Sequence, residues 1–310
     1  MIRQRFESTD APTSSDKNME KPKHLLRVVD SQSAYWVGDG FPVRNLFPSN
    51  PLGADISPFL MLDYAGPHEF APSDKPRGVG EHPHRGFETV SIAYQGSVTH
   101  RDSAGNAGVM GPGDVQWMTA ASGVVHEELH AADFVKHGGV LEMIQLWVNL
   151  PRAHKMSPPR YQSLTNATIP TEKLDEQGSH IRIIAGNWNG HAGGAQTVTP
   201  IELYDLRLKN GAHFDLKLPA GMNSALFLLK GGISIEGKSI EGEAKLALFS
   251  ITGEHITLDA RADSTILVLA GEPIDEPVAQ MGPFVMNSRP ELLQAVEDYR
   301  SGKMGHLAPV

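Results

Sequence analysis

The stretch Glu81-His-Pro-His-Arg-Gly-Phe-Glu-Thr89 carries two histidines one residue apart, His82 and His84, and Gly123-Val-Val-His-Glu-Glu128 carries a matching pair, His126 and Glu128. In an extended strand, residues i and i+2 point to the same face. Two such pairs on neighbouring strands would bring three imidazoles and one carboxylate to one point. This set of ligands suits a non-haem transition metal with open positions for a substrate or dioxygen.

The composition of the chain excludes several classes of protein and of site. The chain has 310 residues, 40% of them hydrophobic, no cysteine and a net charge of −9. The absence of cysteine excludes disulfides, zinc fingers and thiol catalysis, and leaves fourteen histidines as the main soft ligands. The negative charge argues against direct binding of nucleic acid, which needs clustered Lys and Arg. No apolar run has the length of a membrane span, and residues 1–24 lack the apolar centre of a signal peptide. We therefore expect a cytoplasmic protein.

Short apolar runs separated by Gly, Pro and Asp predict an all-β chain. Both halves of the chain show this pattern of short apolar runs, which suggests an internal duplication of a barrel. The exception is a helix predicted at about residues 289–301, where Pro290 suits the first turn and an apolar stripe follows. The stripe consists of Leu292, Leu293, Ala295, Val296 and Tyr299. This helix should pack on a barrel.

These patterns predict three segments. Residues 1–24 are polar and are expected to form a disordered tail. Residues 25–157 would form an N-terminal barrel that binds the metal. Residues 158–310 would form a C-terminal barrel that ends in the helix. This second barrel has no ligand-x-ligand pair, so we expect it to be a degenerate copy without a metal.

Several longer motifs resemble the pirin family of the cupin superfamily. The resemblance begins with HPHRGFETVS at residues 82–91 and continues through PGDVQWMTA at 112–120 and SGVVHEE at 122–128. It includes QLWVNLP at 145–151 and MSPPRYQ at 156–162, and it returns at AGEP (270–273) and GPFVMN (282–287). It therefore spans roughly residues 25–305, and residues 1–24 lie outside it.

The resemblance implies a bicupin, two antiparallel β-barrels packed face to face with one mononuclear metal in the first. The metal ligands of pirins fall on His82, His84, His126 and Glu128. The implied metal is Fe(2+), and Mn, Co, Ni, Cu and Zn are alternatives because metal choice follows availability as much as affinity. Some pirins act as quercetin 2,3-dioxygenases, and a nuclear eukaryotic member acts as a transcriptional coregulator.

Glu88 competes with Glu128 for the place of the carboxylate. His82-x-His84-x-x-x-Glu88 is the generic cupin spacing, and on a regular strand Glu88 would share a face with the histidines. Gly86 is expected to bend the strand and move Glu88 away. The pirin resemblance selects Glu128, and we then expect Glu88 to hydrogen-bond a ligand.

Other residues near these motifs have plainer interpretations. Glu127 should point away from the site, and His100 and Asp102 should form a structural hydrogen-bonded pair. Gln145 is a polar residue on an apolar strand, so it should lie near the metal or bond the backbone. Four large apolar residues are expected to line the pocket or to fill the core: Phe87, Trp117, Met118 and Trp147.

The sequence favours an enzyme, a quercetin 2,3-dioxygenase that binds a small planar aromatic or enol substrate and O2. Glu128 would serve as a ligand and as the base that takes the proton of the substrate hydroxyl. The alternative is a redox-sensing, iron-binding regulatory protein that acts through a protein partner. A metal-dependent isomerase is a third hypothesis, because cupins catalyse many different reactions and a fold does not determine a function.

Overall fold

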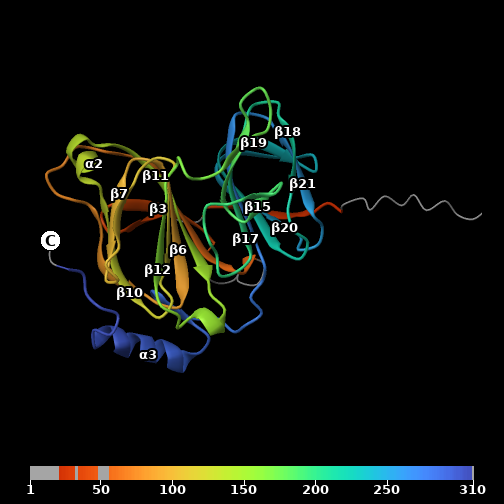
Figure 1. Cartoon of the computed structure of the whole chain (residues 1–310). Coiled ribbons are helices and arrows are strands. Elements are labelled where there is room, and N and C mark those ends of the chain that lie inside the picture. The colour runs from red at the N-terminus through yellow and green to blue at the C-terminus, as the bar shows by residue number, and fades with distance from the viewer. Residues whose placement is uncertain (1–20, 32–33, 48–55, 309–310) are drawn as a thin grey trace, which may run out of the picture.

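The protein folds into two antiparallel β-barrels that lie side by side (Figure 1). The structure is a computed structural model, and it describes residues 21–31, 34–47 and 56–308. Every strand pairing between its named strands is antiparallel, which confirms the predicted all-β fold with two barrels.

In the first barrel, a seven-stranded sheet faces a four-stranded sheet. The larger sheet contains β2 (Ala34–Val37), β3 (Phe41–Phe47), β4 (Phe59–Phe70), β6 (Phe87–Gln95), β9 (Val115–Thr119), β11 (Gly139–Asn149) and β12 (Arg160–Leu164). The smaller sheet contains β5 (Gly78–His84), β7 (Val98–Asp102), β8 (Ala107–Met110) and β10 (Val124–His130). A short helix, α2 (Ala132–His137), joins β10 to β11.

In the second barrel, nine strands form one sheet that curls on itself. They are β1 (Leu25–Asp30), β13 (Thr171–Lys173), β14 (His180–Ala185), β17 (Ile201–Leu208), β18 (His213–Lys217), β19 (Asn223–Ile235), β20 (Lys238–Phe249), β21 (His255–Ala260) and β22 (Ser264–Gly271). Its interior is filled by buried aliphatic side chains such as Ile183, Leu206 and Val268. The remaining elements are short: η1 (Arg152–His154), the pair β15 (Asn187–Trp188) and β16 (His191–Ala192), the pair β23 (Ala279–Met281) and β24 (Phe284–Met286), and α3 (Arg289–Arg300).

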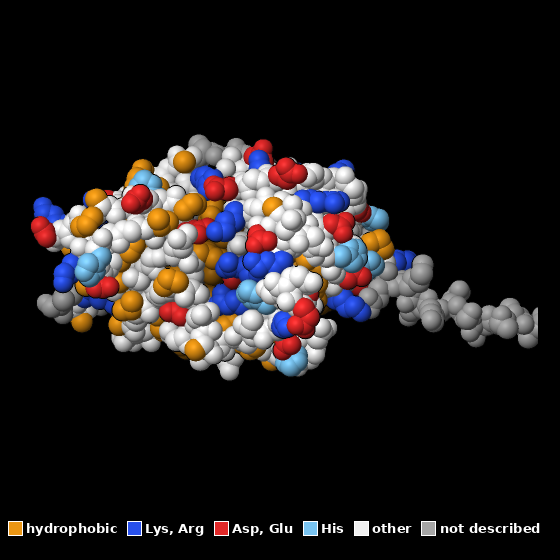
Figure 2. Space-filling model, turned by 90° about the horizontal axis from the view of Figure 1, so that it is seen from above, with side chains coloured by type: hydrophobic (Ala, Val, Ile, Leu, Met, Phe, Trp, Pro, Cys, Tyr) orange, Lys and Arg blue, Asp and Glu red, His pale blue; other side chains and the backbone are white. Residues whose placement is uncertain are grey.

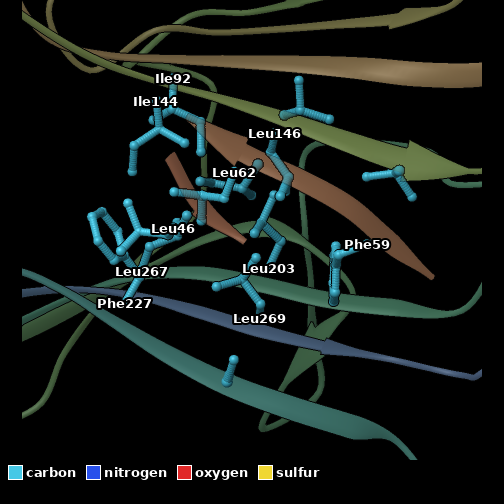
Figure 3. Close-up of a cluster of buried hydrophobic side chains, with 14 of the residues drawn as sticks. Leu46, Phe59, Leu62, Ile92, Ile144, Leu146, Leu203, Phe227, Leu267 and Leu269 are labelled. Atoms are coloured by element: carbon cyan, nitrogen blue, oxygen red, sulfur yellow. The ribbon is translucent and has the colours of Figure 1, made fainter. Parts of the chain in front are cut away.

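The largest apolar cluster holds the two barrels together (Figure 3). Ile144 and Leu146 of β11 point out of the first barrel, and Leu203 of β17 and Leu267 of β22 meet them from the second. These four side chains are fully buried. Burial of such a side chain contributes about 1.5–3 kcal/mol. The seven-stranded sheet is therefore apolar on its outer face, which leaves its inner face free to carry polar groups.

The strand pairings cross the domain boundaries that the sequence predicts. β1 lies in the predicted first segment but pairs with β20 of the second barrel, and β12 lies in the predicted second segment but pairs with β9 of the first. Such long-range pairing is not encoded in the local pattern of either strand. Of the predicted tail, residues 1–20 lie outside the described residues. Lys23 is buried, and its ammonium donates to the carbonyl of Met222 at 2.9 Å, so ordered chain begins before residue 25.

The predicted helix is confirmed as α3, but it packs on the first barrel and not on the second (Figure 1). Leu292 and Ala295 lie against Val125 of β10 and Phe284 of β24, whereas Leu293 of the predicted stripe is 53% exposed. A buried ion pair also holds the helix, because the guanidinium of Arg85 lies 2.8 Å from the carboxylate of Asp298. The C-terminal segment thus returns to the strand that carries His82 and His84.

None of the helices in the described part of the chain has the length and apolar character needed to cross a membrane. On the face seen in Figure 2, acidic and basic side chains are interspersed, with Lys and Arg gathering near the middle. The charges on that face do not form one continuous basic surface.

We predict that Asp298→Asn destabilises the protein in a pH-dependent way. Lys303 and Arg85 hold the pKa of the Asp298 carboxyl well below its ordinary value. The carboxylate therefore stabilises the fold fully above the unfolded-state pKa of about 3.9, and the contribution is lost as the pH falls toward the depressed folded-state pKa. Urea unfolding should show a loss of stability at pH 7 that is smaller at pH 3. The matched control is Asp133→Asn, which removes an exposed carboxylate and should change little at either pH. An equal loss at both pH values for Asp298→Asn would contradict this account.

Candidate metal centre

Three histidines converge where β5 and β10 pair. His82 lies directly opposite His126 in the antiparallel register, and His84 lies opposite Val124. The ring centroids of His82 and His126 are 4.2 Å apart, and each of these rings is 4.9 Å from the ring of His84. One nitrogen from each ring lies within 4.8 Å of the others. The convergence of three imidazoles expected from the two motifs is thus present in the fold.

Two nitrogens in this group have no hydrogen-bond partner. The Nδ1 atom of His82 lies 2.8 Å from the carbonyl oxygen of Gly80. In contrast, Nδ1 of His84 and Nε2 of His126 are buried and unpartnered. Buried polar atoms in folded proteins are almost always partnered. A metal ion bound between the rings would supply the missing bonds, so the residues present fit such a group.

Burial keeps two of these imidazoles neutral. It lowers the pKa of His84 and of His126 well below the ordinary value, and the neighbouring histidines lower both further. A neutral imidazole at pH 7 offers its nitrogen lone pair, which is the form that a metal ligand needs.

Glu128 lies two residues beyond His126 on β10 and lines the same side of the barrel. Its two carboxylate oxygens lie 3.2 Å from the Ser91 hydroxyl of β6 and 3.2 Å from the Gln145 amide nitrogen of β11. The expectation that Gln145 lies near the site is therefore met. The carboxylate groups with His126 and His100 within 4.8 Å, and His126 is the member that this group shares with the group of His82 and His84.

His100 lies closer to the three converging histidines than the sequence predicted. Its Nε2 lies 3.3 Å from Asp102, as the predicted structural pair requires, but its Nδ1 also lies 3.3 Å from Nδ1 of His126. Its ring stacks on Tyr161 of β12, with centroids 4.9 Å apart and planes at 13°. A hydrogen bond to the second ring nitrogen fixes the orientation of a ligating histidine. The i, i+2 pair was visible in the sequence, but the register of β7 against β10 that makes this contact was not.

Glu88 lies on the other side of the sheet. β5 ends at His84, Gly86 has a φ of +89°, and a Cβ atom there would stand 1.9 Å from the carbonyl oxygen of Val285. The backbone turns at this glycine, so the side chains that follow it change faces of the sheet. The side chain of Glu88 therefore points toward the core between the barrels, as those of Val90 and Trp117 do. Its carboxylate accepts a hydrogen bond of 2.6 Å from Thr119, and burial raises its pKa. The expectation that Gly86 moves Glu88 away from the histidines is therefore met. The expectation that Glu88 hydrogen-bonds a ligand of the site is wrong, because its carboxylate bonds Thr119 instead.

An apolar cavity of about 330 Å³ opens beside the histidines. His82, His84, Glu128 and Gln145 form its polar wall, and most of the other lining side chains are apolar, among them Trp147. Of the four large apolar residues expected near the pocket, Trp147 lines it and Phe87 packs against Trp147 with centroids 4.3 Å apart. The other two do not line it, since Trp117 lies in the core between the barrels and Met118 packs with Ala120 and Val124. Glu127 faces away and pairs with Arg101, as expected.

We predict that the two nearby glutamates differ in their effect on metal content. If Glu128 is the ligand, Glu128→Gln should lower the affinity for a divalent metal by at least the roughly 10-fold that loss of a residue supporting a ligand costs. Glu88→Gln should leave the metal content unchanged, because that carboxylate faces Thr119. Glu127→Gln is the matched control on β10. Metal analysis after equilibrium dialysis gives the three values. Loss of metal in Glu88→Gln but not in Glu128→Gln would overturn the assignment.

Several known proteins resemble this chain in sequence and in fold. The family model described as Pirin matches residues 40–148, and the model described as Pirin C-terminal cupin domain matches residues 203–305. A protein of Pseudomonas aeruginosa named "putative quercetin 2,3-dioxygenase" is 52% identical over 281 residues, which cover 91% of this chain and 98% of that protein. Pirin of Homo sapiens is 36% identical over 256 residues, which cover 81% of this chain and 84% of that protein. The crystal structure of a quercetin 2,3-dioxygenase from Acinetobacter baumannii superposes with a TM-score of 0.90 at 46% identity, covering 93% of this chain and all (100%) of that one.

Proposed function

The chain belongs to the pirin family of cupin proteins, and from this membership and the geometry of the pocket we propose that it is a metal-dependent dioxygenase that cleaves a flavonol such as quercetin. His82, His84, His126 and Glu128 would hold one metal ion, Fe(2+) in the first instance. The observation that carries the proposal is the group of three imidazoles with two buried, unpartnered nitrogens, because two of its members, His82 and His84, line an apolar cavity.

The metal and the side chains of the protein would contribute different parts of the reaction. A divalent metal bound there supplies Lewis acidity and redox chemistry toward dioxygen. Glu128 is placed to take the proton of a substrate hydroxyl, since one of its oxygens accepts a hydrogen bond from the Gln145 amide and both oxygens keep a free lone pair. The Ser91 hydroxyl donates to the side-chain oxygen of Gln145 and so orients the amide that holds the carboxylate in position. A base held in this way is ready to act before the substrate arrives.

The walls of the cavity select the shape of the substrate. Phe41, Val43, Met143 and Trp147 offer apolar surfaces that suit a flat aromatic molecule. The cavity volume of about 330 Å³ falls at the lower end of the range for small-molecule sites. A bound ring system would displace water from the polar wall, which strengthens the interaction of Glu128 with a substrate hydroxyl.

We predict that anaerobic loading with Fe(2+), followed by quercetin and air-saturated buffer, gives oxygen uptake with one carbon monoxide released per dioxygen consumed. Glu128→Gln should lower turnover by about 100-fold or more, because a positioned base contributes about 10²–10⁴ to a rate. Glu127→Gln, on the opposite face of β10, should retain turnover. An oxygen electrode and a haemoglobin assay for carbon monoxide provide the measurement.

A fully loaded protein that consumes no oxygen with quercetin would refute the dioxygenase proposal. In that case the alternative, an iron-binding regulatory protein that acts through a protein partner, would become the better account. The same metal-loaded sample would then serve in a comparison of partner binding between the Fe(2+) and Fe(3+) forms.

A further inference from the structure

A second carboxylate, Asp63 of β4, lines the cavity beside the histidines. It is only 4% exposed. Its Oδ2 accepts a hydrogen bond of 2.9 Å from the hydroxyl of Tyr35, and its Oδ1 accepts one of 2.7 Å from the amide of Asn45. Both donors are neutral, and each carboxylate oxygen keeps a lone pair. Burying a charged group is costly unless it is well partnered, so this carboxylate is an unusual component of an apolar wall.

Asp63 continues a row of polar side chains that starts at Glu128. In the register of the seven-stranded sheet, Asp63 lies opposite Gln145 of β11, and Gln145 lies opposite Ser91 of β6. Registered neighbours in an antiparallel sheet share a face, so this row crosses the inner face of the barrel. Gln145 accepts a hydrogen bond from Ser91 and donates one to Glu128, whereas Asp63 lies one strand, or about 5 Å, further along the sheet. The cavity therefore has two separate acidic points, one beside the histidines and one beyond Gln145.

The charges of the wall restrict what can occupy this second point. Among the described residues that line the cavity, the carboxylates are Asp63 and Glu128, and none is Lys or Arg. A ligand carboxylate or phosphate would be repelled by Asp63. A neutral hydroxyl would instead donate a hydrogen bond to the free lone pair, and such bonds to a charged acceptor are stronger than bonds between neutral groups.

We propose that Asp63, positioned by Tyr35 and Asn45, binds a phenolic hydroxyl of the substrate at the end remote from the three histidines, so that the pocket selects polyhydroxylated aromatic molecules over those with a single hydroxyl. This inference rests on the proposed function, because it assumes that another oxygen of the same molecule lies beside Glu128. It adds a point of recognition that depends on the hydroxyl pattern of the substrate and not on the metal.

The test is a binding measurement under anaerobic conditions, where no turnover occurs. Isothermal titration calorimetry compares quercetin with 3-hydroxyflavone, which keeps the 3-hydroxyl and lacks the other hydroxyls, on the Fe(2+)-loaded wild-type protein and Asp63→Asn. The amide of this variant keeps the size of the side chain but has one acceptor oxygen, which Tyr35 and Asn45 already require. Quercetin affinity should fall by about 10- to 100-fold, whereas the affinity for 3-hydroxyflavone should change by less than about threefold.

The comparison of the two ligands separates the outcomes. Unchanged binding of 3-hydroxyflavone verifies that the variant is folded and loaded with metal. If Asp63→Asn misfolds, Asn45→Ala removes a positioning donor from outside the cavity lining and should weaken quercetin binding selectively, though less strongly. Parallel loss for both ligands, or no loss for either, would show that Asp63 has only a structural role and would overturn the proposal while leaving the dioxygenase intact. Failure of the wild-type protein to bind either flavonol would refute both.

Discussion

The antiparallel pairing of β5 with β10 is the constraint on which the rest of the site depends. It sets His82 directly opposite His126 and places His84 one step along the same face. A slip of this register by one residue would turn the His126 and Glu128 side chains to the opposite face. The neighbouring pairing of β10 with β7 then brings His100 against His126, and the facing sheet presents Ser91 and Gln145 to Glu128.

The end of β5 is held by the C-terminal segment. Arg85 directly follows His84 and is bonded to Asp298 of α3. Gly86 is held by the buried ammonium of Lys155, which lies 2.7 Å from the Gly86 carbonyl, 2.7 Å from the Asn149 side-chain oxygen and 3.0 Å from the Val285 carbonyl. Burial lowers the pKa of Lys155 to about 7, which means that desolvation of its ammonium costs free energy. The three hydrogen bonds of this ammonium nevertheless join three separate segments of the chain at this turn. The site thus depends on a residue 213 positions away in the sequence, since Arg85 is bonded to Asp298.

Local motifs were sufficient to predict the fold class, the helix and the convergence of the three histidines, because strand alternation and i, i+2 spacing are local properties. They were insufficient wherever long-range pairing decides the outcome. The assignment of β1 to the second barrel, the contact of Tyr161 with His100 and the polar row through Asp63 all follow from register between distant strands. Glu88 was predictable in part. Gly86, which has a positive φ, turns the strand as expected, but the bond from Thr119 to the Glu88 carboxylate follows from the register of β6 with β9.

Anomalous diffraction from crystals of the metal-loaded protein tests the central claim most directly. The account predicts one ion per chain, bonded to the imidazoles of His82, His84 and His126 and to the carboxylate of Glu128, with the Glu88 carboxylate remote from it. An ion bonded instead to His100, His126 and Glu128, with His82 and His84 free, would contradict it, and so would a site that includes Glu88.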